Sequence, residues 1–471
     1  MTQTKIEQLF EGSVTVQGGA VTINDASRVA GPYLDVLVRQ AVFGDDDQRA
    51  DARWLIWEIA QALGIYPSSI HDLYIARGNG AYSNVTVPAI NVRGMAYDTA
   101  RAVFRSANKL NAGAFVLEIA RSEIAYTDQR PAEYASVVLA AAIREGFRGP
   151  LFIQGDHFQI SAKKFATNPD QEAGAVKQLA VEAVAAGFYN IDIDTSTLVD
   201  ISRPTLEEQQ RANVEQCADI AAFVRGLQPA GIVISLGGEI GEVGTENSTP
   251  EELRAYMDGF NNLLGRESPG TEGLSKVSVQ SGTSHGGIVL PDGSIKEVAI
   301  DFDTLTKLSG IARKEYGLAG AVQHGASTLP DALFHKFPAT GACEIHLATN
   351  FQNMLFDHMP DSLRSEIYAW LDKNTADERK STDTDEQFFY KTRKKALGPF
   401  KRKIWDMAVD AKAALAKAYD EKFEFLFRQL NIHDTRELIA KHVHPLVQHR
   451  PMPHPDLAGA AAAPDDADLS D

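Results

Sequence analysis

The stretch PLFIQGDH, at residues 150–157, is a short apolar run that ends in two polar side chains, Asp156 and His157. A run of this length bounded by turn residues is typical of a buried strand, whereas the long amphipathic stretches on either side are typical of helices. The chain contains eight such strand-like runs: VTVPAINVR (85–93), AFVLEIA (114–120), PLFIQGDH (150–157), NIDIDT (190–195), GIVISLGGEIG (231–241), VSVQSG (277–282), GAVQHG (320–325) and ACEIHLAT (342–349).

Strand-like and helix-like segments alternate regularly along this part of the chain. Several of the helix-like segments, such as QEAGAVKQLAVEAVAAG, end at glycine, a residue that often terminates helices. Eight strand–helix repeats over about 270 residues match a (β/α)₈ barrel in number and length. We therefore predict a TIM barrel with helical extensions at both ends, and the competing layout is a doubly wound open sheet.

The chain is longer than one barrel requires. Its 471 residues exceed the size at which a single hydrophobic core usually stops growing. We predict an N-terminal extension at residues 1–84, a catalytic barrel at 85–360, a helical extension at 361–450 and a disordered acidic tail at 451–471. The two extensions are expected to cover the barrel or to join subunits.

Composition excludes several classes of function. The formal charge of −17, from 46 basic and 63 acidic residues, argues against a nucleic-acid or anionic-membrane partner. No apolar stretch approaches the length of a membrane span, and the first residues lack the layout of a signal peptide, so we expect a cytoplasmic protein. With only Cys217 and Cys343, any metal must be held by histidine and carboxylate.

Three histidines follow the predicted strands at corresponding positions. His157, His285 and His324 end or follow the third, sixth and seventh runs. In a barrel, side chains at the carboxyl ends of the strands meet on the catalytic face. Three imidazoles with an open coordination position suit a catalytic Zn²⁺, although each histidine alone is more often a hydrogen-bonded structural residue.

Carboxylates and glycine-flanked segments share the same face. The third, fourth and fifth runs end in or precede acidic residues, and the segments GTSHGG and HGAS follow the sixth and seventh. Glycines let the backbone approach a ligand closely, and exposed amides can bind a phosphate there; the alternative is a tight turn without a ligand. The acidic residues are Asp156, Asp192, Asp194, Glu239, Glu242 and Glu246.

These motifs together resemble the class II, metal-dependent fructose-bisphosphate aldolases. The resemblance rests on VPAINV, GDH, IDTS, EIGEVG, GTSHGG and HGAS, which occur in the family's order between about residues 85 and 350. It implies Zn²⁺ at His157, His285 and His324, and a proton-transfer role for Asp156 in the aldol step. For Asp156, a carboxylate that merely orients a histidine is the alternative.

The resemblance also implies roles around the substrate. Glu239 and Asp194 resemble carboxylates at a second, more buried site for a metal or monovalent cation, and Glu246 resembles the loop glutamate that removes the proton from the ketone phosphate. The residues expected to bind the substrate are Gly286, Gly325, Ala326, Ser327, His346 and Thr349.

The eighth run departs from the family pattern. Its Asn and Asp are replaced here by His346 and Ala348, which leaves the identity of the ketose open. His346 replaces the lost hydrogen bond, acts as an acid or base, or is a packed barrel histidine. Arg121 or Ser122, after the second run, is a candidate contact for a second phosphate.

The expected function is aldol cleavage of fructose 1,6-bisphosphate to dihydroxyacetone phosphate and glyceraldehyde 3-phosphate, as in glycolysis and gluconeogenesis. The expected partner is a small phosphorylated sugar, and relatives suggest a homodimer or homotetramer. The alternatives are an aldolase for another ketose phosphate, such as tagatose 1,6-bisphosphate, and a non-catalytic sugar-phosphate-binding barrel. A metal-dependent hydrolase is disfavoured because the first run ends in AINVRG, without paired histidines.

Overall fold

The computed structural model describes residue 6 and residues 8–241, 246–282, 290 and 300–453. The chain divides into two compact units. The first comprises residues 1–66, 136–149 and 447–471, and the second comprises residues 67–135 and 150–446. All eight predicted strands lie in the second unit.

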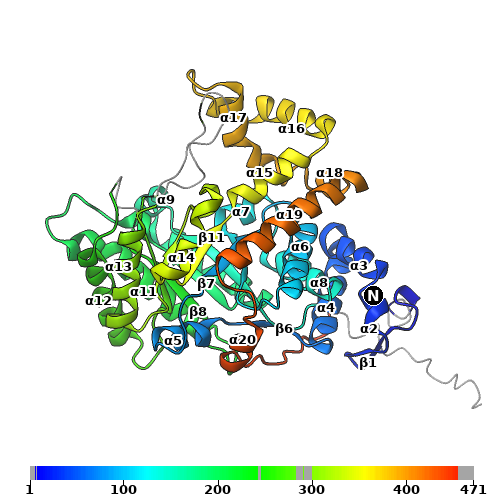
Figure 1. Ribbon diagram of the computed structural model, residues 1–471, viewed down its shortest axis with the longest axis horizontal. Coiled ribbons are helices and arrows are strands. Elements are labelled where there is room, and N and C mark those ends of the chain that lie inside the picture. The colour runs from blue at the N-terminus through cyan, green and yellow to red at the C-terminus, as the bar shows by residue number, and fades with distance from the viewer. Residues whose placement is uncertain (1–5, 7, 242–245, 283–289, 291–299, 454–471) are drawn as a thin grey trace, which may run out of the picture. The chain divides into compact units, whose positions relative to one another are not determined.

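The second unit is built around a closed parallel barrel (Figure 1). The strands follow the order β6-β5-β4-β11-β10-β9-β8-β7, and β6 also pairs with β7, which closes the sheet. The TIM-barrel prediction is therefore confirmed, and the open-sheet alternative is wrong. The strands are β4 (Val87–Asn91), β5 (Val116–Ala120), β6 (Gly149–Gln159), β7 (Asn190–Asp194), β8 (Ser235–Glu239), β9 (Lys276–Val279), β10 (Ala321–Gln323) and β11 (Glu344–Leu347).

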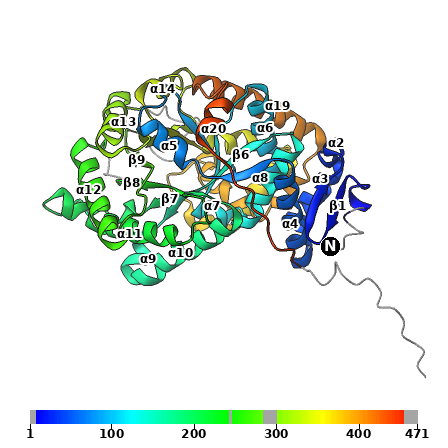
Figure 2. The same cartoon turned by 90° about the horizontal axis from the view of Figure 1, so that it is seen from below.

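The helices that follow the strands begin and end at residues suited to those positions. Asn168 caps the start of α10, which begins at Pro169, by accepting a hydrogen bond from the Gln171 amide. Gly187 ends the same helix in the left-handed conformation, with a φ of 99°. Helices α11 to α13 lie outside strands β7 to β9 (Figure 2). Helices of the barrel region are α5 (His71–Gly78), α6 (Ala96–Lys109), α7 (Arg121–Tyr126), α8 (Pro131–Arg144), α9 (Ala162–Thr167), α10 (Pro169–Ala186), α11 (Leu206–Gly226), α12 (Pro250–Glu267), α13 (Phe302–Tyr316), α14 (Lys336–Thr340) and α15 (Thr349–His358), with 3₁₀ turns at η1 (Ser196–Leu198), η2 (Ala326–Thr328) and η3 (Asp331–Leu333).

A helical segment follows the last strand and packs on the barrel helices. Helix α19 lies against α6, where Arg105 pairs with Asp420 at 2.9 Å and Lys109 pairs with Glu424 at 2.7 Å. The elements of this segment are α16 (Asp361–Asn374), η4 (Ala376–Glu378), α17 (Asp385–Thr392), η5 (Arg393–Ala396), α18 (Lys401–Trp405), α19 (Val409–Gln429) and α20 (Arg436–His442).

The first unit contains a small hairpin and two longer helices. Its elements are β1 (Val14–Gln17), β2 (Ala20–Ile23), α2 (Ala26–Val29), α3 (Pro32–Phe43) and α4 (Asp46–Ala62). The next strand, β3 (Ile65–Ser68), contains Tyr66, the last residue of the first stretch of this unit. The indole of Trp57 donates to the carbonyl of Gln448, and the Arg450 guanidinium lies 3.3 Å from the centre of the Trp57 ring. Residues 454–471 of the predicted disordered tail lie outside the described residues.

Close backbone packing at Gly78 leads to a stability prediction. A Cβ at this residue would lie 2.0 Å from the carbonyl oxygen of Gly317, whereas a Cβ at Gly174, within α10, would meet open space. Because the Gly317 carbonyl belongs to the backbone and cannot rotate away from an added methyl group, Gly78→Ala should lower the free energy of unfolding by about 1–3 kcal/mol. Gly174→Ala is the matched control and should be neutral or stabilising, because alanine favours helix. Chemical denaturation followed by circular dichroism measures both; equal midpoints would contradict the close approach.

Candidate active site

The carboxyl ends of the barrel strands surround a cavity of about 610 Å³. Each of the eight strands contributes at least one wall residue at or just beyond its end, so the cavity lies on the face where the sequence places the chemistry. One wall residue from each strand, in chain order, is Arg93, Ala120, Asp156, Asp194, Glu239, Gln280, His324 and His346.

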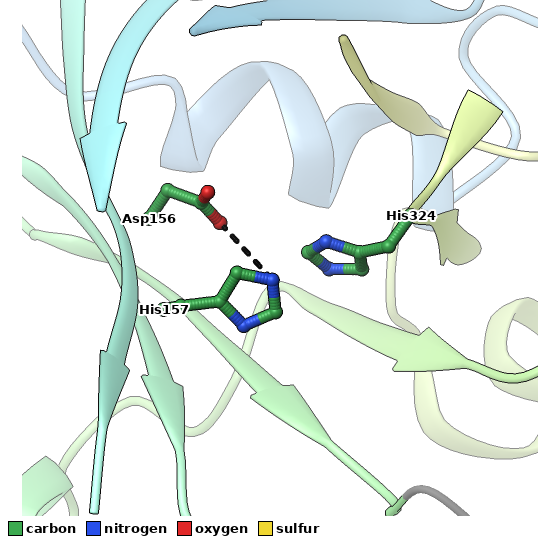
Figure 3. Close-up of side chains that lie close together, drawn as sticks. All are labelled: Asp156, His157 and His324. Atoms are coloured by element: carbon green, nitrogen blue, oxygen red, sulfur yellow. Dashed lines mark ion pairs between the residues drawn. The ribbon is translucent and has the colours of Figure 1, made fainter. Parts of the chain in front are cut away.

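Asp156, His157 and His324 converge in this cavity (Figure 3). Their candidate ligand atoms all lie within 4.8 Å of one another. The centres of the two imidazole rings are 4.3 Å apart, and His157 Nε2 lies 3.8 Å from Asp156 Oδ1. The two imidazoles are suited to a transition-metal ion such as zinc, and the Asp156 carboxylate lies beside them.

A bulge in β6 explains how two successive residues face the same cavity. Neighbouring side chains on a regular strand point to opposite faces. The pairing of β6 with β7 shifts register between Gly155 and Phe158, and His157 adopts a φ of 39°, which is rare outside glycine. The bulge thus turns His157 toward the cavity that Asp156 also lines.

Two further carboxylates orient His157. Its Nδ1 lies 2.9 Å from Asp194 Oδ2 and 3.4 Å from Glu239 Oε2. When Nδ1 donates to Asp194, Nε2 keeps its lone pair, which is the arrangement that metal-binding histidines commonly use. His157, Asp194 and Glu239 also form a second group whose ligand atoms lie within 4.8 Å, at the residues predicted for a second cation.

The ionisation of Asp156 follows from its neighbours. Burial opposes its negative charge, but the His157 and His346 rings outweigh this effect and hold the pKa of Asp156 below its usual range. Asp156 is therefore a carboxylate at neutral pH, as a proton acceptor must be.

His346 lies deeper, between the histidine pair and a buried polar network. Its ring centre is 4.1 Å from that of His324. Its Nδ1 lies 3.1 Å from Glu118 Oε2 and 3.2 Å from Asp156 Oδ1, and its Nε2 lies 2.7 Å from Glu344 Oε1. His346 thus packs in the barrel interior and also lines the cavity, and its role toward the substrate stays a prediction.

Lys276 is the cation at the base of this network. Its ammonium group contacts Glu344, lies 2.9 Å from Asp192 Oδ1 and donates to Gln154 at 2.8 Å, while its side chain is only 1% exposed. Burial lowers the pKa of Lys276, but the two carboxylates outweigh it, so the amine stays charged. Burial and the nearby Asp156 raise the pKa of Glu118 to about 7.

These network residues were missed in the sequence, although a charged residue within each of two otherwise buried strands was visible. Glu118 stands inside LEIA of β5, and Lys276 opens KVSV of β9. Charged residues are almost never fully buried unless they are paired. A charged residue inside a buried strand therefore indicates a buried charge network.

The predicted phosphate-binding segment lies at the end of β10. Gly325 has a φ of 71°, and both it and Ser327 line the cavity, whereas Ala326 is buried. The Ser327 hydroxyl accepts a hydrogen bond from the Thr349 amide at 3.2 Å, which links the ends of β10 and β11. The segment therefore reaches the cavity, although its binding role stays a prediction.

Other predicted site residues are placed differently. His285 and Gly286 lie outside the described residues, and Glu246 is exposed and does not line the cavity. Their roles stay predictions. Arg121 pairs with Glu172 at 2.6 Å and does not line the cavity, which removes it as the contact for a second phosphate; its neighbour Ser122 does line it.

A family comparison agrees with this geometry. The family model named fructose-bisphosphate aldolase class-II matches residues 79–424, most of the chain. The chain belongs to the class II fructose-bisphosphate aldolases. The predicted family is thus confirmed, and members of this family generally depend on a metal ion.

Several solved structures are similar to this class II aldolase. A protein titled a probable tagatose 6 phosphate kinase, from Sinorhizobium meliloti, is 16% identical, covers 76% of this chain and 99% of its own, and superposes with a TM-score of 0.52. Fructose-bisphosphate aldolase from Campylobacter jejuni is 17% identical, covers 79% and 97%, and gives 0.47; the YdjI aldolase from Escherichia coli is 12% identical, covers 78% and 98%, and gives 0.46. No curated protein matches the chain. Among the described residues, no helix is long and apolar enough to cross a membrane.

The buried network leads to a prediction for the aldolase. Lys276→Met should lower the thermal unfolding midpoint by about 5–10 °C, because removing one partner leaves buried carboxylates uncompensated. Lys403→Met, which breaks an exposed pair with Glu366, is the control and should hardly change the midpoint. Adding Glu344→Gln to Lys276→Met should restore part of the loss. Equal midpoints for the two single variants would contradict the role of Lys276.

Proposed function

We propose that this class II aldolase uses zinc to cleave a ketose bisphosphate reversibly, with fructose 1,6-bisphosphate as the leading substrate. The products are dihydroxyacetone phosphate and glyceraldehyde 3-phosphate. One observation carries the proposal: the Asp156 carboxyl group lies beside a His157–His324 pair at the wall of a cavity large enough for a sugar phosphate.

The proposed metal site consists of His157 and His324, with His285 as the third ligand expected from the family. The donor set of imidazoles and the orienting contact between His157 and Asp194 support zinc. When bound there, zinc would act as a Lewis acid that stabilises the negative charge developing on the ketone oxygen. Asp194 and Glu239 are proposed to hold a second cation.

Asp156 is the proposed base of the cleavage step. It would accept the proton of the C4 hydroxyl while the C3–C4 bond breaks, so that C4 becomes the aldehyde and the bonding electrons form the enediolate of the ketone half. Protonation of C3 then completes dihydroxyacetone phosphate. Glu246 is proposed to deliver that proton, since the family places a loop glutamate in this role.

The substrate phosphate is proposed to bind at the loops after β9, β10 and β11. Gly286, Gly325, Ala326, Ser327 and Thr349 are the residues assigned to it. The contact between Ser327 and Thr349 supports this assignment, because it presents a hydroxyl and neighbouring amides at the cavity wall. The second candidate substrate is another ketose phosphate, such as tagatose 1,6-bisphosphate, because His346 and Ala348 replace the family's Asn and Asp and line the same cavity.

We further propose that the protein is a homodimer or homotetramer in the cytoplasm and acts in glycolysis or gluconeogenesis.

Asp156→Asn separates catalysis from metal binding. We expect this variant to keep the zinc content of the wild type and to lose about 10²–10⁴-fold in kcat for fructose 1,6-bisphosphate, because the proton acceptor is gone. His324→Ala should instead lose zinc. Triose-phosphate release and metal analysis of the purified proteins measure the two effects, with tagatose 1,6-bisphosphate tested in parallel. Normal turnover by Asp156→Asn would remove Asp156 from the proton-transfer role.

A further inference from the structure

Two buried amide side chains lie behind the ends of β7 and β8. Gln210 and Asn213 come from helix α11, which lies outside these strands (Figure 2). They are three residues apart, so they share one face of the helix, and both are almost completely buried. A buried amide group needs partners for its oxygen and for its nitrogen, so the contacts of these two side chains show what they hold in place.

The pairing between β7 and β8 stops just before two of the carboxylates at the site. Its last pair is Ile193 with Gly238, one residue before Asp194 and Glu239. Each of these acidic residues still pairs with the strand on its other side, β6 for Asp194 and β9 for Glu239. The strand pairing therefore does not join the two residues to each other, although both contact Nδ1 of His157.

Asn213 connects the two strands at this point. Its Nδ2 donates to the Glu239 carbonyl at 2.9 Å, and its Oδ1 accepts a hydrogen bond from the Thr195 hydroxyl at 2.5 Å. Thr195 directly follows Asp194 in the chain. The Asn213 side chain therefore joins the end of β7 to the end of β8 where the strand pairing no longer does.

Gln210 fixes the orientation of the Asn213 amide. Asn213 Nδ2 also donates to Gln210 Oε1 at 2.9 Å, and Gln210 Nε2 donates to the Ile240 carbonyl at 2.6 Å. Reversing either amide would place its oxygen against a backbone carbonyl oxygen, so only one arrangement satisfies the network. The network therefore holds the backbone at the ends of both strands in a defined position.

We propose that Asn213 is a positioning residue for the metal site. It fixes Asp194, through Thr195, relative to Glu239, and thereby keeps both carboxylates in contact with Nδ1 of His157. The Nε2 atom of that ring then keeps its lone pair for a metal ion. Asn213 does not line the cavity and acts only through these neighbours. This inference rests on the proposed function, because it adds a residue of a barrel helix to the proposed zinc site.

Zinc affinity tests the proposal without relying on turnover. Competition with a chelator of known affinity should show about 10–100-fold weaker zinc binding by full-length Asn213→Ala, as is typical when a group that orients a metal ligand is lost. Thr195→Val keeps the shape of the side chain and removes its hydroxyl, so it should also weaken zinc binding. Thr195→Ser keeps the hydroxyl and should bind zinc as the wild type does.

Asn190 provides the matched control, because it is equally buried and lies on the same strand at the opposite end. Its amide donates to the carbonyls of Ser68 and Ile153 at 3.2 and 2.9 Å. Asn190→Ala should lower the thermal unfolding midpoint, as Asn213→Ala does, because both leave buried polar groups without partners. Unlike Asn213→Ala, it should keep the zinc affinity of the wild type.

The dependence of activity on free zinc separates positioning from a loss of stability. Asn213→Ala should need about 10–100-fold more zinc for half of its maximal cleavage of fructose 1,6-bisphosphate. Equal zinc affinities of Asn213→Ala and Asn190→Ala, or wild-type affinity in Thr195→Val, would overturn the positioning role. If the wild type binds zinc, Asn213→Ala binds it more weakly and neither cleaves the sugar, the proposed activity fails and the positioning role stands.

Discussion

Charge balance inside the barrel is the constraint on which the site depends. Glu118, Asp156 and Glu344 are all buried, and isolated carboxylates cannot remain ionised away from water without nearby cations. Lys276 pairs with Glu344 at the base of the barrel, and His346 lies between that base and the carboxylates of Glu118 and Asp156. Closer to the cavity, further carboxylates surround His157 in a cluster that favours a metal ion. The negative interior and the candidate metal site are thus parts of one electrostatic arrangement.

The backbone geometry brings the charged side chains of the barrel together at the cavity. The bulge of β6 directs both Asp156 and His157 into the cavity, which a regular strand would not do. The helical segment after the barrel then adds Lys394 at the cavity wall. The wall of the cavity therefore carries both acidic residues suited to a cation and basic residues suited to an anion.

The sequence predicted those features that depend on local pattern. Strand–helix alternation predicted the barrel, and the polar residues that end each run predicted the cluster of Asp156, His157 and His324. The Lys276–Glu344 contact joins β9 and β11, which do not pair directly because β10 lies between them, and no local sequence pattern specifies such a contact. Arg121 was a reasonable phosphate contact, but Glu172, fifty-one residues away, pairs with it. Lys394 reaches the cavity only through long-range backbone packing that a linear reading does not contain.

The central claim is that this cavity removes and returns a proton on a ketose phosphate with the help of a metal. The most direct measurement is exchange of the C3 proton of dihydroxyacetone phosphate with deuterated solvent, followed by NMR, because it does not depend on which aldehyde the enzyme uses. The account predicts exchange by the zinc-loaded protein, its loss after exhaustive chelation and its recovery when zinc is restored. No exchange by the loaded protein, or exchange that survives chelation, would contradict it.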